Sequence, residues 1–147
     1  MGHHRVAVTG ERIDLAAIAA EVGDAEHGAQ VIFAGAVRAT NDGRRVKAVS
    51  YDVYSPLAEA TFGEIAREAQ ARCEDPLRIV VIHRRGKLEL GELSVVIGVS
   101  SPHRSEAYEA SRYVIEQLKT RAPVWKKEHY EDGETEWLRG HALCRHG

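Results

Sequence analysis

A concentration of positive charge lies at residues 119–128, which read KTRAPVWKKE. The segment holds four cations and one carboxylate, although the whole chain carries a net charge of −2. Pro123 prevents a helix from continuing, so we expect Lys119 in a last helical turn and Lys126 on a following strand. Alternation along that strand would place Lys126 and Lys127 on opposite faces. The segment could form a local anion site, but the charge count alone favours a solvated helix end.

A second cationic segment, SPHRS at 101–105, falls where a long helix is expected to begin. The first turn of a helix exposes unpaired backbone N–H groups and the positive end of the helix dipole. His103 and Arg104 would oppose that dipole, and a bound phosphate would remove the conflict. A surface histidine beside a solvated arginine is the alternative interpretation, and the residues alone favour neither.

Two further positions could take part in chemistry. Arg38 ends an apolar segment beside the turn residues 41–43, where its guanidinium could bind an anion through two hydrogen bonds. An ordinary strand-end arginine fits equally well. His83 follows a buried strand and opens the basic run HRRGK, so it could act as a general base, although a histidine on an apolar strand is more often a core residue.

Several chemistries find no support in the sequence. Its eight histidines form no HxxxH or HExxH pair, and the two cysteines form no CxxC pair, so we expect no metal and no cofactor. Phosphate-loop, dinucleotide-binding and GxSxG motifs are also missing. Cys73 falls on an apolar helix face and is expected in the core, while Cys144 stands near the end of the chain. Nucleic-acid binding is disfavoured by the net charge of −2 and by only 6% aromatic residues.

Length and composition limit how these groups are held. The 147 residues, with 44% hydrophobic and 29% charged, suit one globular domain over 1–147. No apolar run reaches the roughly 20 residues of a membrane span, and the first residues resemble no signal peptide. Two cysteines make no disulfide framework, so we expect a reducing, cytoplasmic location.

Hydrophobic spacing and turn residues predict an α+β domain with largely antiparallel sheet. The first strand pair is expected to form a hairpin across the TNDG turn, and Ser55 and Ser101 are expected to open the two long helices. Tyr108 is placed on the inner face of the second of these helices. Helices are predicted at 14–22, from Ser55 to before Asp75, and from Ser101 to before Pro123; strands are predicted at 30–38, 46–54, 77–83, 93–100, 124–130 and 134–138, with a short extended piece at 88–90.

Several of these segments together resemble the large, catalytic subunit of molybdopterin synthase, the MoaE family. The resemblance runs through about residues 28–138 in one order without large gaps. The segments that carry it are FAGAVR at 33–38 with Asn41 and Gly43, YDVY at 51–54, VIHRRGKL at 81–88, VSSPHR at 99–104 and LKTRAPVWKKE at 118–128.

The resemblance implies an α/β hammerhead-like fold with an added antiparallel β subdomain. It also implies an activity, the conversion of cyclic pyranopterin monophosphate (precursor Z) to molybdopterin by installation of two sulfurs. The sulfur would arrive as a thiocarboxylate on the C-terminal glycine of a small ubiquitin-like subunit. That subunit is expected to be a separate chain, in a heterotetramer built around a homodimer of the large subunit.

By position in the family pattern, Lys119 and Lys126 match the catalytic lysines. The matching substrate-pocket residues are Ala36, Val37, Arg38, His103, Arg104, Lys127 and Glu128. A non-catalytic module that binds a phosphate ligand or a partner on the same scaffold is the alternative, and the presence of both lysines favours the enzyme. The sequence departs from the pattern by two apolar exchanges, Leu57 for a common Met and Val124 for a common Phe, and by Thr40, where the family often carries a His before the Asn.

Overall fold

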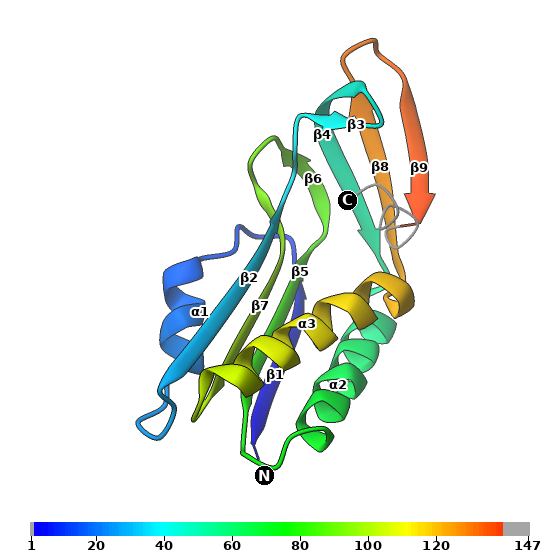
Figure 1. The fold of residues 1–147 in the computed structure, drawn as a ribbon. Coiled ribbons are helices and arrows are strands. Elements are labelled where there is room, and N and C mark those ends of the chain that lie inside the picture. The colour runs from blue at the N-terminus through cyan, green and yellow to red at the C-terminus, as the bar shows by residue number, and fades with distance from the viewer. Residues whose placement is uncertain (1, 140–147) are drawn as a thin grey trace.

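The structure is a computed structural model that describes residues 2–139, and Cys144 lies outside this range. Its elements alternate between two sheets (Figure 1). The helices are α1 (Leu15–Val22), α2 (Ser55–Ala71) and α3 (Arg104–Arg121); the strands are β1 (His3–Thr9), β2 (Ala29–Ala36), β3 (Thr40–Asn41), β4 (Arg44–Val53), β5 (Arg78–Arg84), β6 (Gly86–Glu89), β7 (Leu93–Ser101), β8 (Val124–Tyr130) and β9 (Thr135–Arg139).

The first sheet has the strand order β1-β5-β7-β2 and is covered on both faces by helices. Strand β5 is buried along most of its length because alternate residues enter two different cores. Val81 packs with α2 and α3 on one face, where Phe62 and Val114 are completely buried. Val80 packs on the other face with Ile18 and Val22 of α1.

The second sheet stands beyond the C-terminal end of α3 and consists of β3, β4, β8 and β9, with β6 also paired to β4 (Figure 1). All of its pairings are antiparallel. The α+β class, the largely antiparallel sheets and the added β subdomain are therefore as predicted. In the first sheet only β1 and β5 run parallel.

The predicted hairpin between the strands at 30–38 and 46–54 is wrong. Strand β2 pairs with β7 of the first sheet, whereas β4 belongs to the second sheet. The TNDG turn instead joins the two-residue strand β3 to β4, with Asp42 and Gly43 both at positive φ. Two positive φ angles suit a tight hairpin turn, so the turn residues were identified correctly and their strand partner was not.

Three local predictions also need correction. The cap of α2 is Tyr54, so Ser55 begins the helix itself rather than capping it. The cap of α3 is His103, two residues later than the expected Ser101, because Ser101 still belongs to β7 and donates its hydroxyl to the carbonyl of His103. Tyr108 is 64% exposed and lies outside the inner face of α3. The last two predicted strands are confirmed as β8 and β9, which pair antiparallel in a hairpin around Asp132–Gly133.

Candidate functional site

One cavity at the junction of the two sheets gathers residues that lie far apart in the sequence. It has a volume of about 200 Å³ and receives Arg38 from the segment that follows β2, Lys119 from α3, and Lys126 and Glu128 from β8. We call it the lysine cavity. Three cations around one carboxylate make it suitable for an anionic ligand. The other lining residues are Phe33, Gly35, Ala36, Val37, Thr40, Asn41, Val46, Val49, Tyr51, Ser94 and Val95.

The turn after α3 brings the two lysines together. Ala122 caps the helix by donating its N–H to the carbonyl of Leu118, and Val124 already pairs with Val53 of β4. Only a short turn therefore separates the end of α3, which carries Lys119, from β8, which carries Lys126. Strand alternation turns Lys126 toward the cavity, whereas Lys127 faces away and lies 5.3 Å from the ring centre of Trp137. Lys127 does not line the lysine cavity.

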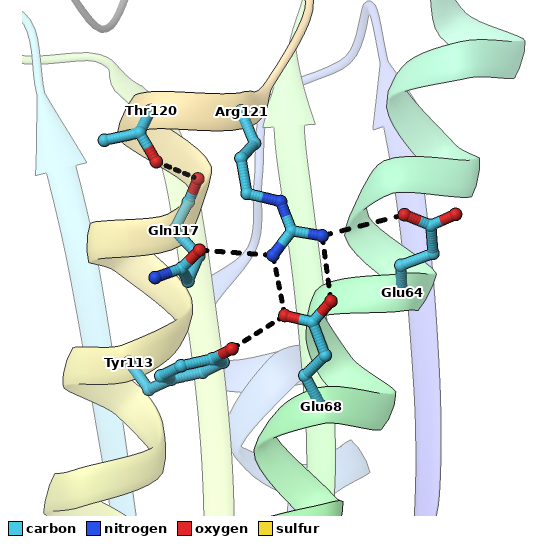
Figure 2. A network of polar contacts seen from close by, with 6 residues as sticks. All are labelled: Glu64, Glu68, Tyr113, Gln117, Thr120 and Arg121. Carbon is cyan, nitrogen blue, oxygen red and sulfur yellow. Dashed lines mark hydrogen bonds and ion pairs between the residues drawn. The ribbon is translucent and has the colours of Figure 1, made fainter.

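A network of polar contacts fixes the last turn of α3 to α2 (Figure 2). The Arg121 guanidinium donates to both carboxylate oxygens of Glu68, at 2.6 and 2.9 Å. The Tyr113 hydroxyl donates to Glu68 at 2.7 Å, and Glu64 lies 3.6 Å from Arg121. These hydrogen bonds to Arg121 and Tyr113 lower the pKa of Glu68 to about 2. A two-pronged arginine–carboxylate contact is directional, so it holds the helical turn that carries Lys119.

Glu128 is the buried acid of the lysine cavity, with a side chain only 1% exposed. Its Oε1 accepts a hydrogen bond from the Asn41 amide at 2.7 Å and lies 3.9 Å from the Lys126 ammonium. Its Oε2 has no hydrogen-bond partner among the described residues. Asn41 comes from the β3–β4 hairpin, so the TNDG turn also helps to hold the acid of the site.

Burial changes the acid–base behaviour of Lys126. Desolvation lowers the pKa of its ammonium, and the charges of Lys119 and Arg38 lower it further, while the Glu128 carboxylate opposes the shift. A lysine whose proton is held less tightly is better suited to give up that proton at neutral pH. Burial acts in the opposite direction on Tyr51, which lies between these groups and the first sheet: it raises the pKa of the phenol.

Gly35 is required by the close contact of β2 and β7 beside the cavity. A Cβ added at Gly35 would lie 2.9 Å from Cγ1 of Val95. The register of β2 and β7 shifts between Gly35 and Ala36, so the strand bends where Arg38 leaves the sheet. This bend directs Ala36, Val37 and Arg38 along the wall of the lysine cavity.

His103 and Arg104 lie elsewhere on the same chain. Both are exposed at the N-terminal end of α3, and His103 caps the helix without a side-chain hydrogen bond. From Arg104 to Lys119 the axis of α3 rises by roughly 22 Å at 1.5 Å per residue. One chain therefore does not bring His103 and Arg104 to the lysine cavity, and their part in substrate binding stays a prediction.

A second, smaller cavity of about 90 Å³ adjoins the lysine cavity and shares Tyr51, Ser94, Val95, Lys119 and Lys126 with it. We call it the His83 cavity, because His83 lines this cavity and not the lysine cavity. Its remaining wall is apolar and comes from Ile115, Leu118, Ala122 and Val124. Sequence reasoning missed Tyr51 and Ser94 as site residues, since neither is charged and each lies on an otherwise ordinary strand.

A larger groove lies between α2 and α3 and measures about 730 Å³. Five carboxylates and two arginines line it, and neither lysine reaches it. Cys73 also lines this groove and not the lysine cavity. A surplus of carboxylates repels a phosphate, so size alone does not identify the site, and the smaller cationic cavity is the better candidate.

The fold and the cavity together define a two-sheet α+β protein with a cationic cavity lined by two lysines. Comparison with known proteins agrees, because the model of the family described as "MoaE protein" matches residues 8–121. The chain belongs to this MoaE family. Lys126, Lys127 and Glu128 lie just beyond the matched segment.

Similarity to individual relatives extends over nearly the whole chain. The molybdopterin synthase catalytic subunit of Synechococcus elongatus is 44% identical over 142 residues, which cover 97% of this chain and 86% of the relative. That of Bacillus subtilis is 40% identical, with 91% of this chain and 84% of the relative covered. The crystal structure of molybdopterin synthase from Staphylococcus aureus superimposes with a TM-score of 0.85 at 33% identity, over 90% of this chain and 95% of that one.

A fourth likeness concerns the fold alone. A solved complex of subunits 1 and 2 of the molybdopterin-converting factor from Helicobacter pylori contains a chain with a TM-score of 0.72 at 23% identity. The aligned part covers 91% of this chain and 90% of that one. The predicted hammerhead-like fold with its added β subdomain is therefore the fold of these molybdopterin synthase structures.

Proposed function

We propose that this chain is the catalytic subunit of a molybdopterin synthase and acts as a sulfurtransferase in the cytoplasm. Its substrate is cyclic pyranopterin monophosphate, and two sulfurs come from the thiocarboxylated C-terminus of a small ubiquitin-like subunit. The observation that carries the proposal is the convergence of Lys119, Lys126 and Arg38 on one cavity beside the buried Glu128. The names of the relatives support the same activity.

The charges of the lysine cavity suit both anions of this reaction. Arg38 at its wall can bind the cyclic phosphate through two hydrogen bonds. Lys119 lies between the two cavities and can stabilise negative charge on the thiocarboxylate as the sulfur attacks. Lys126, whose pKa is lowered by burial, can give its proton to the oxygen that leaves the substrate.

A separate sulfur donor is supported by the composition of the two cavities. Among the described residues that line them there is no cysteine, so neither cavity offers a thiol of its own. The solved complex of subunits 1 and 2 of the Helicobacter pylori factor shows that a chain of this fold assembles with a second subunit there. We propose the same arrangement here, with the carrier's tail ending beside Lys119.

The positions of His103 and Arg104 favour a homodimer at the centre of the assembly. Because one chain holds them roughly 22 Å from Lys119 along α3, they can act on the same phosphate only from a second copy. A twofold dimer offers this naturally, since each copy then gives its Arg104 to the cavity of the other. Each complete site would contain residues of two chains.

A three-component reaction tests the function. The purified protein is mixed with thiocarboxylated small subunit and precursor Z, and the pterin product is analysed by mass spectrometry. We expect a product containing two carrier-derived sulfurs only when all three components are present. Carrier ending in an ordinary carboxylate is the matched control. Absence of sulfurated product in the complete mixture would refute the proposed function.

A further inference from the structure

His83 is a titratable residue of the His83 cavity that the proposed mechanism has not used. It lies near the end of β5 with only 9% of its surface exposed, and its ring contacts Tyr51 and Phe62 at centroid distances of 5.1 and 6.5 Å. The cavity also receives Lys119 and Lys126. His83 is thus buried beside both lysines.

The hydrogen bonding of His83 fixes which ring nitrogen carries the proton. Its Nδ1 lies 2.7 Å from the carbonyl oxygen of Arg84. A carbonyl oxygen can only accept, so Nδ1 must be the protonated nitrogen. Nε2 then presents a lone pair, and it forms no hydrogen bond within residues 2–139. Burial, assisted by the charge of Lys119, lowers the pKa of His83 to about 4, so the ring is neutral at pH 7.

The chemistry of sulfur transfer creates a need for such a base. When a thiocarboxylate sulfur bonds to a carbon of the substrate, the acyl carbon of the carrier remains attached to that sulfur as a thioester. Releasing the carrier requires water to add to the acyl carbon and the acyl–sulfur bond to break. A group that accepts the proton of that water accelerates such a step by roughly 10²–10⁴. Positively charged lysines cannot accept it.

We propose that His83 is a further catalytic residue, the general base that activates the water which hydrolyses the thioester between carrier and substrate. This inference rests on the proposed function. Water oxygen bonds to the acyl carbon, Nε2 of His83 takes the proton, and the acyl–sulfur bond breaks with its electron pair on sulfur. The carrier leaves as a carboxylic acid, which releases its proton to solvent, and the sulfur stays on the substrate as a thiolate that the imidazolium can protonate. No oxidant or reductant is consumed.

The surroundings of His83 fit this step. A volume of about 90 Å³ exceeds the roughly 10–15 Å³ that one water molecule needs. The titratable groups that line the cavity with the ring are the Tyr51 phenol from β4, Lys119 from α3 and Lys126 from β8. The charge of the Glu128 carboxylate also raises the pKa of Tyr51. The two ammonium groups stabilise the oxyanion that forms when water adds. They also disfavour a positive charge on the imidazole ring before the reaction.

The test follows the covalent state of the carrier in a single turnover. His83→Asn keeps an amide donor where Nδ1 donates to Arg84, but it removes the basic Nε2. His83→Gln is a second variant without a basic nitrogen. We expect adduct formation at the wild-type rate, accumulation of a carrier–substrate species that hydroxylamine cleaves, and a fall in turnover of about 10²–10³. His129→Asn, on the face of β8 that bears Lys127, is the matched control.

Two results would overturn the inference. One is turnover of either His83 variant within a fewfold of wild type. The other is loss of turnover without an accumulated thioester, which would place His83 before sulfur transfer. The wild-type protein gives an independent check, because ¹⁵N NMR of the imidazole should show a neutral ring protonated at Nδ1 at pH 7. A ring protonated at Nε2, or charged at pH 7, would also refute it. If the wild-type mixture itself makes no sulfurated product, the proposed function fails instead.

Discussion

The two ends of α3 carry similar charges in very different surroundings. At the C-terminal end, Lys119 joins a cavity with Lys126, and the turn is fixed by the contact of Arg121 with Glu68. At the N-terminal end, Arg104 is exposed, and the helix lacks a side-chain cap. The C-terminal end is therefore a site built within one chain.

The difference shows why charge in a sequence is an incomplete guide to a site. Cations at a helix C-terminus complement the dipole, whereas those at the N-terminus oppose it. His103 and Arg104 thus lack a local structural reason for their positions, and in the proposed dimer the substrate of a second copy supplies one. The predictions below test residues at or near one end of α3.

The largest effect is expected at the C-terminal end. Lys119→Ala and Lys126→Ala should each lower the rate of molybdopterin formation by about 10²–10³, because a preorganised charge is lost from the cavity. The three-component assay measures this rate, and circular dichroism checks folding. Lys47→Ala, an exposed lysine of β4, is the matched control. Near-normal turnover in either cavity variant would contradict the assignment.

The N-terminal end is tested by mixing variants. Arg104→Ala should lower turnover by roughly tenfold to a hundredfold, the scale of one lost charge-assisted contact. Co-expression of Arg104→Ala with Lys119→Ala chains should restore up to about a quarter of wild-type activity, since half of the dimers then hold one intact site. The assay is the same three-component reaction on the purified mixture.

The control for this mixing uses two variants of the same end. Lys119→Ala mixed with Lys126→Ala leaves every cavity with a defect of its own chain, so no activity should return. Recovery in that mixture, or none in the first, would show that Arg104 does not act across the dimer.

The sequence predicted the lysine cavity better than the connections around it. Strand alternation correctly separated Lys126 from Lys127, because the period of a strand is a local property. The pairing of β2 with β7 was missed, since a turn signal at residues 40–43 cannot say which earlier strand returns to β4. Strand β1 was missed as well: it pairs in parallel with β5, and three polar residues at its start hide the pattern.

Local sequence patterns also could not predict how far apart the two cationic segments lie. Residues 101–105 and 119–128 are each basic, but only the length of α3 between them sets their distance. His83 shows the reverse case: the sequence favoured a core residue, and the structure finds it buried yet lining a cavity. Whether a buried residue meets a cavity depends on packing that no local pattern records.

A smaller effect is expected from loosening the anchor of Lys119. Glu68→Gln keeps the shape of the side chain but removes the charge that Arg121 binds at two oxygens. We expect kcat to fall by about tenfold with little change in KM, because a small displacement of a catalytic group affects the transition state most. Glu64→Gln, whose carboxylate lies 3.6 Å from Arg121, is the control and should change kcat less than twofold. Equal effects of the two variants would contradict an anchoring role.

The smallest effect concerns the acid stability of the same anchor. The pKa of Glu68 is lowered to about 2 in the folded protein from an ordinary value of 4.5, so folding favours its charged form. Its contribution to the free energy of unfolding is therefore fully present above pH 4.5 and is lost as the pH falls toward 2. Urea unfolding of wild type and Glu68→Gln between pH 7 and pH 3 measures this. The wild type should unfold at higher urea at pH 7, and the two midpoints should approach each other below pH 4.5. A gap that stays constant over this range would show that the Glu68 charge does not stabilise the end of α3.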